Sequence, residues 1–307
     1  DVRLLSPDRA TDAFHGDFVP VWINDPAALQ AHLENPPAWV GLDTEFVRER
    51  TYWPQLALVQ MAIGDEILLI DTLAPGINEA LRPLLSNPAV LKVMHSASED
   101  LVALSHECGV LPAPLFDTQI AAALCGVGGG MGYQKLVQAI TGVALAKGET
   151  RSDWLRRPLS DSQLEYAADD VVYLGAIHRE LEARLQAQDR SGWLAQDCAR
   201  LLANAADEGE RWPHLSMRSS QIMDAPSQAR LLRLLRWRDV QARSSDKPRS
   251  WILDNELAAM LARVPPADRS ALQAQLDTHP KAPRKLGDAI WQALTTPLDD
   301  EPDMPLA

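Results

Sequence analysis

Short apolar runs in the first third of the chain have the length that is typical of β-strands. They cover residues 18–23, 39–46, 55–63, 66–71 and 91–95. The Gly64-Asp65 pair separates two of these runs, and such a pair favours the tight turn of an antiparallel hairpin. The pattern therefore predicts a sheet that is built early in the chain.

Helical segments alternate with these runs and then replace them. The pattern predicts helices over about residues 26–33, 77–85, 98–107, 117–125, 133–140, 160–188 and 192–207. Residues 126–132 are rich in glycine but lack the spacing of a phosphate-binding loop, so we interpret them as a connection and expect no small-molecule cofactor. Strands followed by helices in this order predict an α/β domain with a mixed sheet.

From about residue 213 onward the pattern is helical only. Helices are predicted over about residues 226–243, 254–263, 267–277 and 284–295. The last ten residues are acidic and contain proline, which predicts a disordered tail. We therefore expect an α/β domain over residues 1–207, a helical domain over residues 208–297 and a tail over residues 298–307.

Charge is distributed unevenly over these parts. The formal net charge of −13 argues at first against a nucleic-acid partner. Residues 211–297, however, hold 14 lysines and arginines against 8 acids, whereas the tail holds 4 acids and no base. This asymmetry indicates that the helical part binds a polyanion. The alternative is a mildly basic helical surface that is simply solvated.

The composition is that of a soluble globular protein. The hydrophobic fraction is 46% and the charged fraction 23%, and no segment approaches the ~20 apolar residues of a membrane helix. The first residues lack the charged and apolar regions of a secretory signal. Three cysteines without C-x-x-C spacing disfavour a zinc site or a disulfide framework. We therefore expect a cytoplasmic protein with no membrane partner.

Two carboxylates, Asp43 and Glu45, lie at the end of the first long apolar run. Side chains alternate along a strand, so residues two apart project from the same face. Two adjacent carboxylates repel each other unless a cation lies between them, and hard divalent ions such as Mg²⁺ or Mn²⁺ prefer oxygen ligands. The pair therefore predicts a metal site. The alternative is a solvated strand end that carries two surface acids.

Two further acids are candidates for the same site. Asp100 follows a buried strand and lies in the first turn of a predicted helix, where the helix dipole alone also favours an acid. Tyr166 and Asp170 are four residues apart on a predicted helix and therefore share a face. The alternative for this second pair is a core tyrosine beside a solvated acid.

Taken together, these motifs resemble those of one known family. The order D-x-E, H-x-x-x-E-D-L and Y-x-x-x-D resembles the RNase D family of DEDD-type 3′→5′ exonucleases, in the subfamily that has tyrosine in place of histidine. Other segments match as well: Phe46-Val47-Arg48, Thr51 to Leu56, Leu58-Val59-Gln60, Phe116 to Gln119, Gly132-Tyr133, Lys147 to Trp154 and Asp161 to Leu174. The resemblance implies an RNase H-like mixed sheet flanked by helices.

The resemblance also implies the chemistry. Asp43, Glu45, Asp100 and Asp170 match the four metal-binding carboxylates, which implies two divalent ions, Mg²⁺ or Mn²⁺, as cofactors. Two such ions stabilise the attacking and leaving oxygens of a phosphodiester. Tyr166 has an ordinary pKa near ~10 and is expected to orient the attacking water rather than accept its proton. The expected reaction removes 5′-nucleoside monophosphates from the 3′ ends of structured RNA, above all of tRNA precursors.

The helical part has a resemblance of its own. Trp237-Arg238-x-x-x-Ala242, Asp246-Lys247-Pro248 and Leu253-Asp254-x-x-Leu257 are similar to the HRDC domain, a small helical bundle that accompanies RNase D and RecQ helicases. One copy fits the sequence, whereas some relatives carry two. The resemblance implies that this module holds RNA.

Five cations are candidates for contact with substrate phosphates. Arg48, Lys147 and Arg151 belong to the first domain, and Lys247 and Arg249 to the second. Arginine and lysine contacts to phosphates position a nucleic acid without reading its sequence. The alternative for each of them is an ordinary solvated surface charge.

Two other functions remain open at this point. One is a DNA 3′→5′ exonuclease of proofreading or RecQ-associated type, which the lack of a separate polymerase or helicase motif disfavours. The other is a non-catalytic RNA-binding adaptor, which the complete set of acids disfavours. Cleavage of RNA but not DNA in the presence of a divalent metal would distinguish the exoribonuclease from both.

Overall fold

The computed structural model describes residues 19–146, 148–149, 151–206 and 209–307. These residues form two compact units. Residues 19–47 and 54–206 belong to the first unit, and residues 48–53 and 209–307 to the second. The two units are described separately below.

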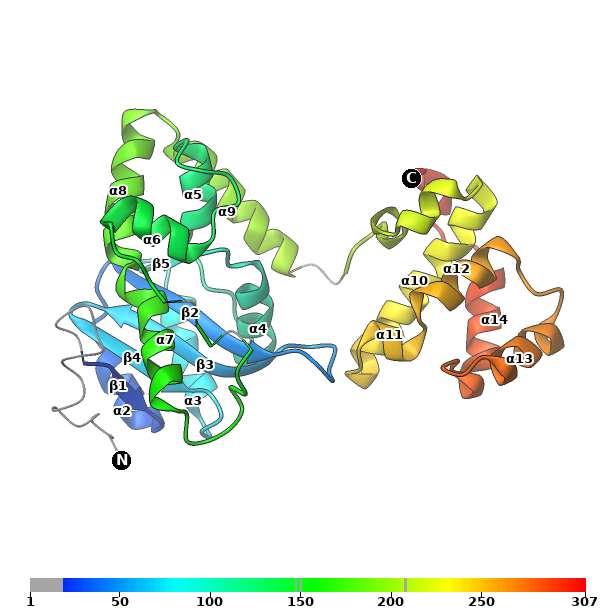
Figure 1. Ribbon diagram of the computed structural model, residues 1–307, viewed down its shortest axis with the longest axis horizontal. Helices are drawn as coiled ribbons and strands as arrows, with labels where there is room; N and C mark the ends of the chain where they lie inside the picture. Colours follow the sequence, from blue (N-terminus) through cyan, green and yellow to red (C-terminus); the bar gives the residue numbers. More distant parts are fainter. Residues whose placement is uncertain (1–18, 147, 150, 207–208) are drawn as a thin grey trace. The chain divides into compact units, whose positions relative to one another are not determined.

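A mixed six-stranded sheet is the centre of the first unit (Figure 1). Its strands are β1 (Val21–Ile23), β2 (Trp39–Val47), β3 (Gln55–Ile63), β4 (Glu66–Asp71), β5 (Leu91–Met94) and β6 (Leu115–Asp117), in the spatial order β1-β4-β3-β2-β5-β6. The pairs β2–β3 and β3–β4 are antiparallel, whereas β1–β4, β2–β5 and β5–β6 are parallel. The α/β fold with a mixed sheet that the sequence predicts is thus confirmed.

The hairpin between β3 and β4 follows from its sequence. Every residue of β3 after Gln55 is buried, and Gly64 adopts a positive φ of 54° in the turn, which costs a glycine little. The antiparallel pairing of the two strands confirms the predicted hairpin. The short strand β6 was not predicted. It ends at Asp117, whose carboxylate accepts hydrogen bonds from the backbone amides of Gln119 and Ile120 and so caps the next helix.

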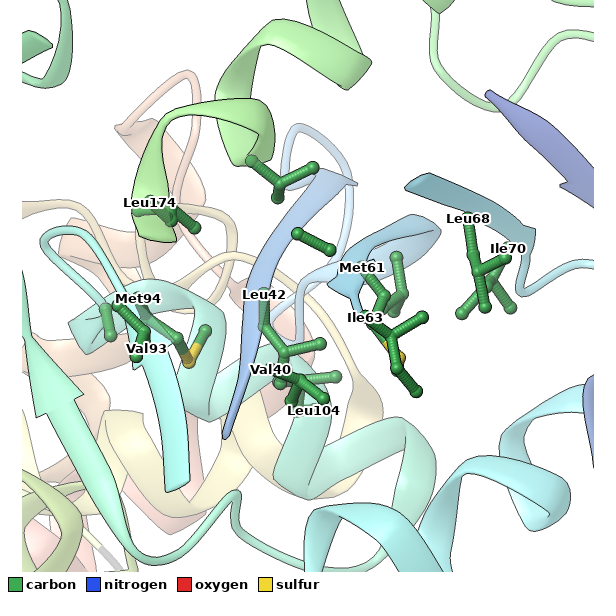
Figure 2. Packing of buried hydrophobic residues seen from close by; sticks show 14 of the residues in the cluster. Val40, Leu42, Met61, Ile63, Leu68, Ile70, Val93, Met94, Leu104 and Leu174 are labelled. Atoms are coloured by element: carbon green, nitrogen blue, oxygen red, sulfur yellow. The ribbon is translucent and has the colours of Figure 1, made fainter. Parts of the chain in front are cut away.

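Helices cover both faces of the sheet (Figure 1). They are α2 (Pro26–Leu33), α3 (Ile77–Leu85), α4 (Ser98–Cys108), α5 (Thr118–Leu124), α6 (Tyr133–Thr141), α7 (Asp161–Val172), α8 (Leu174–Ala187) and α9 (Ser191–Ala206). Figure 2 shows Leu104 of α4 beside Val40 and Leu42 on one face of β2, and Leu174 of α8 on the other. The segment that carries Asp43 and Glu45 is therefore held between two helical layers.

A close approach between α8 and β2 depends on Gly41. A Cβ atom at this position would lie 3.1 Å from Cδ1 of Leu174 and 3.3 Å from Cβ of Ala62. Both distances are tighter than ordinary van der Waals contact, so a larger residue would push α8 away from the sheet.

The single helix predicted over residues 160–188 is in fact two helices. Helix α7 begins with a capping box, in which the Ser160 side chain and the Gln163 side chain each bond to the other residue's backbone amide. The chain leaves the helical hydrogen-bond pattern at Tyr173, and α8 follows at once. No proline marks the break, and the polar pattern is similar on its two sides. The nearest signal is Gly175, in the first turn of α8, because glycine disfavours a continuous helix.

The second unit is a helical bundle. Its α-helices are α10 (Ala225–Ser245), α11 (Arg249–Ile252), α12 (Asn255–Arg263), α13 (Arg269–Thr278) and α14 (Gly287–Thr295). Short 3₁₀ turns over Pro213–Ser216 and Arg218–Ile222 precede α10. Leu231, Leu257 and Ile290 belong to its buried core. The small all-α module that the sequence predicts is confirmed.

The acidic last ten residues differ from the prediction of disorder. They contain a 3₁₀ turn, Glu301–Asp303, and pair with arginines of α10. Arg236 lies 2.6 Å from Asp300, and Arg233 donates two hydrogen bonds to Glu301. The composition of the tail alone does not reveal these partners, because they lie some 65 residues earlier in the chain.

No helix in the described part of the chain combines the length and apolar composition needed to cross a bilayer.

Candidate active site

The alternation of β2 divides its side chains between the two faces of the sheet. Asp43 pairs with Gln60 of β3 across the antiparallel ladder, and Glu45 pairs with Leu58. Both acids project toward the face on which α7 lies, and α7 brings Asp170 to the same place. Thr44, between the two acids, projects toward the other face, which carries α4.

Three of the four predicted metal ligands lie close together. Asp43, Glu45 and Asp170 each offer a carboxylate oxygen, and these oxygens lie within 4.8 Å of one another. All three residues are half-buried. The group forms because alternation along β2 places Asp43 and Glu45 on one face of the sheet, and α7 packs on that face with Asp170.

The fourth acid, Asp100, is not part of that group. It lies in the first turn of α4 and is buried. Its carboxylate accepts a hydrogen bond from the hydroxyl of Thr44. Burial, followed by the charges of Asp100, Asp170 and Glu45, raises the pKa of Asp43, so Asp100 is nevertheless close to that carboxyl. It is therefore a neighbour of the three acids that is oriented toward Thr44.

The electrostatics of the four acids are unfavourable without a cation. Burial, followed by the charges of Asp170 and Asp100, raises the pKa of Glu45 to about 9. Burial, followed by Asp169, raises the pKa of Asp170 to about 8. Burial also raises the pKa of Asp100 to about 7, although the hydrogen bond from Thr44 opposes the shift. Upward pKa shifts of this kind are expected when several carboxylates share a buried site, because burial and like charges both disfavour the ionised form.

The donor set fits a hard divalent cation. Every ligand atom is a carboxylate oxygen, which is the donor that Mg²⁺ and Mn²⁺ prefer. Among the described residues, no lysine or arginine forms an ion pair with any of the four acids. A metal ion bound by these oxygens would lower the raised pKa values.

Tyr166 lies on α7 one turn before Asp170. Burial, followed by the charges of Asp170, Glu45 and Asp43, raises the pKa of the Tyr166 hydroxyl well above its usual range. The phenol therefore stays protonated and can act as a hydrogen-bond donor.

The ring of Tyr166 is held by close packing. Gly148 lies directly against it, since a Cβ atom at Gly148 would be only 1.8 Å from Cδ2 of Tyr166. The ring centroid of Trp154 lies 6.1 Å from that of Tyr166.

Two residues of the site were missed at the level of the sequence. Gln60 is fully buried, and its amide nitrogen lies 3.5 Å from an oxygen of Asp43 and 3.5 Å from an oxygen of Glu45. Thr44 is the donor to Asp100. A polar residue in the middle of the apolar run 55–63 was the available signal for Gln60. The signal for Thr44 was its place between two acids, which puts it on the opposite face.

The candidate phosphate-binding cations are placed unequally. Arg151 is exposed, and Arg48 donates a hydrogen bond of 3.0 Å to the Tyr52 carbonyl. Lys247 is exposed, with its ammonium 6.0 Å from the centroid of the Trp251 ring. Arg249 forms an ion pair of 2.7 Å with Asp239, so part of its charge is already compensated. Lys147 lies outside the described residues.

Two family models match the chain. The first is described as a 3′-5′ exonuclease and matches residues 20–186. The second is the HRDC domain and matches residues 227–294. The first match contains all four acids and Tyr166, and the second lies within the helical unit.

Curated relatives and solved structures agree with these models. The chain is 67% identical over 291 residues to ribonuclease D of Xanthomonas oryzae pv. oryzae. This alignment covers 94% of this chain and 80% of the relative. Ribonuclease D of Pseudomonas paraeruginosa is 40% identical, with coverage of 89% and 73%. The crystal structure of Escherichia coli RNase D, described as an exoribonuclease involved in structured RNA processing, has a TM-score of 0.76 and 32% identity, with coverage of 90% and 75%.

Proposed function

Because the chain belongs to the ribonuclease D family and is a 3′→5′ exoribonuclease, we propose that it trims the 3′ ends of structured RNA by two-metal-ion hydrolysis. The observation that carries this proposal is the convergence of Asp43, Glu45 and Asp170 from β2 and α7. The raised pKa values of these acids mean that a divalent cation would bind in place of protons.

The four acids divide the work of holding the cations. Asp43, Glu45 and Asp170 would be the principal ligands, since their oxygens already lie near one another. Asp100 would complete the set after turning from the Thr44 hydroxyl. Two bound divalent cations, Mg²⁺ or Mn²⁺, would supply the positive charge that stabilises the attacking and the leaving oxygen of the phosphodiester.

Tyr166 would orient the nucleophile. Its hydroxyl stays protonated near neutral pH, because its pKa is raised by burial and by the three nearby acids. A protonated phenol cannot accept the proton of the attacking water, but it can hold that water by a hydrogen bond. Attack on the terminal phosphodiester with departure of the 3′ oxygen releases a 5′-nucleoside monophosphate and shortens the RNA by one residue.

The proposed substrates are structured RNAs, with tRNA precursors first among them. The E. coli relative is described as involved in structured RNA processing. The helical unit carries an HRDC match, and residues 211–297 within it hold 14 lysines and arginines against 8 acids. A basic module raises affinity for the RNA backbone without reading sequence. The exposed side chains of Arg151 and Lys247 are the first candidates for phosphate contacts.

A comparison of RNA with DNA tests the proposed function directly. The protein is incubated with 5′-labelled RNA and DNA oligomers of the same sequence, with Mg²⁺, with Mn²⁺ and with EDTA. We expect a one-nucleotide ladder on RNA, 5′-monophosphate products and no cleavage in EDTA. A ladder on DNA but not on RNA would instead support the DNA exonuclease, and tight RNA binding without cleavage would support the adaptor.

Replacement of Tyr166 by phenylalanine tests the role of the hydroxyl. A hydrogen bond to a reacting group is worth ~1.5–3 kcal/mol, so we expect kcat to fall by about 10- to 100-fold. KM for RNA should change little, because the ring remains in place against Gly148. The matched control is Tyr173→Phe, which removes a hydroxyl at the end of the same helix. A Tyr166→Phe enzyme with unchanged kcat would contradict the proposed role.

A further inference from the structure

Gln60 is a polar side chain in an otherwise apolar strand. It lies in the middle of β3, directly across the ladder from Asp43, and has no exposed surface. On its other side Gln60 pairs with Leu69 of β4, which is equally buried. A buried amide costs free energy unless its donor and acceptor are both satisfied, so its presence in this strand needs an explanation.

The donor side of the amide faces the acids. Nε2 lies 3.5 Å from Oδ2 of Asp43 and 3.5 Å from Oε1 of Glu45. Both distances are long for a hydrogen bond, as expected when one nitrogen is shared between two carboxylates. The opposite orientation of the amide would place its oxygen against both negative charges, so electrostatics fixes the nitrogen on this side.

The acceptor side of the same amide has no partner. Oε1 of Gln60 is buried and accepts no hydrogen bond within the described part of the chain. Leucine or methionine would fill the same place without leaving an unpaired carbonyl. The arrangement is therefore poor for stability alone, and its one gain is the nitrogen held between two acids.

We propose that Gln60 is a positioning residue that orients Asp43 and Glu45 for the divalent cation. This inference rests on the proposed function, since it assigns a role in the same metal centre. One neutral donor shared by two carboxylates holds one oxygen of each in place and leaves the other oxygen to face the metal. Residues that hold metal ligands in this way commonly change metal affinity by ~10- to 100-fold when they are replaced.

Substitution of Gln60 by methionine separates positioning from packing. Gln60→Met keeps the length and volume of the side chain but removes the donor. We expect the dissociation constant for Mn²⁺, measured on the full chain by titration calorimetry and by the Mn²⁺ paramagnetic resonance signal, to rise about tenfold or more. The Tm of the metal-free protein should stay close to that of the parent. The control is Leu69→Met, which changes a buried neighbour on the same face and should leave both values unchanged.

Each result decides the question. Unchanged Mn²⁺ affinity in Gln60→Met would overturn the proposal, as would an equal loss in Leu69→Met. If Gln60→Met does not fold, Gln60→Asn serves instead, because its amide is one methylene too short to reach both acids and should weaken Mn²⁺ binding as well. A parent protein that binds Mn²⁺ but does not cleave RNA would overturn the proposed function alone. A parent that binds no more Mn²⁺ than Asp43→Asn would overturn both.

Discussion

Asp43→Asn is expected to reduce the rate of RNA cleavage by about three orders of magnitude. The change keeps the size of the side chain but removes one of three carboxylate oxygens that lie within 4.8 Å of one another. Metal ions contribute several kcal/mol of charge stabilisation to such a transition state, and about 4 kcal/mol corresponds to ~10³ in rate. The measurement is single-turnover cleavage of a labelled RNA at saturating Mg²⁺.

RNA binding should change little in the same variant. Binding to the RNA backbone depends on cations elsewhere in the chain, so the dissociation constant for RNA should stay within about threefold of the parent value. Asp65→Asn, in the exposed turn between β3 and β4, is the matched control for loss of a negative charge. Near-normal turnover of Asp43→Asn would exclude the assignment of the metal centre.

The metal-free protein should lose stability as the pH rises from about 5 to about 8.5. The pKa of Asp100 is raised to about 7, that of Asp170 to about 8 and that of Glu45 to about 9. Between their ordinary pKa values and these raised values, the folded state binds more protons than the unfolded state. The free energy of unfolding therefore falls with increasing pH across this range. A divalent cation replaces the protons and should remove most of the slope.

The expected size of this effect can be measured by thermal unfolding with EDTA and with Mg²⁺. Three independent pKa shifts of this size would change the free energy of unfolding by much more than about 2 kcal/mol. Even a net change of about 2 kcal/mol alters Tm by roughly 4–8 °C in a domain of this size. Asp43→Asn removes one of the repelling charges, so its metal-free form should show a shallower dependence on pH. A parent whose Tm changes equally with pH in EDTA and in Mg²⁺ would contradict the prediction.

The acidic site was largely predictable from local sequence. Alternation along a strand places Asp43 and Glu45 on one face, and a spacing of four on a helix places Tyr166 beside Asp170. Which way Asp100 turns was not predictable, because that depends on the Thr44 hydroxyl on the opposite face. The role of Gln60 depends on the register of β3 against β2, which the sequence of neither strand reveals by itself.

The larger architecture was predictable where the pattern was periodic. The hairpin of β3 and β4 and the all-helical second unit follow from apolar runs and turn residues. The three-residue strand β6 is too short to have a period, and the break at Tyr173 occurs without proline. The acidic last ten residues were misjudged because their order comes from arginines on α10, and composition contains no information about such distant pairing.

The place of β2 inside the sheet has a consequence for how the protein unfolds. The strand has a neighbour on each side, β3 and β5, so its amides belong to the part of the unit that should open last and exchange hydrogen most slowly. A slip of one residue along β3 would turn Asp43 and Glu45 to the opposite face and Thr44 toward α7. In a partly folded chain with the wrong register, Asp43 and Glu45 would therefore not lie beside Asp170. The protein can become active only when β2 and β3 are correctly aligned.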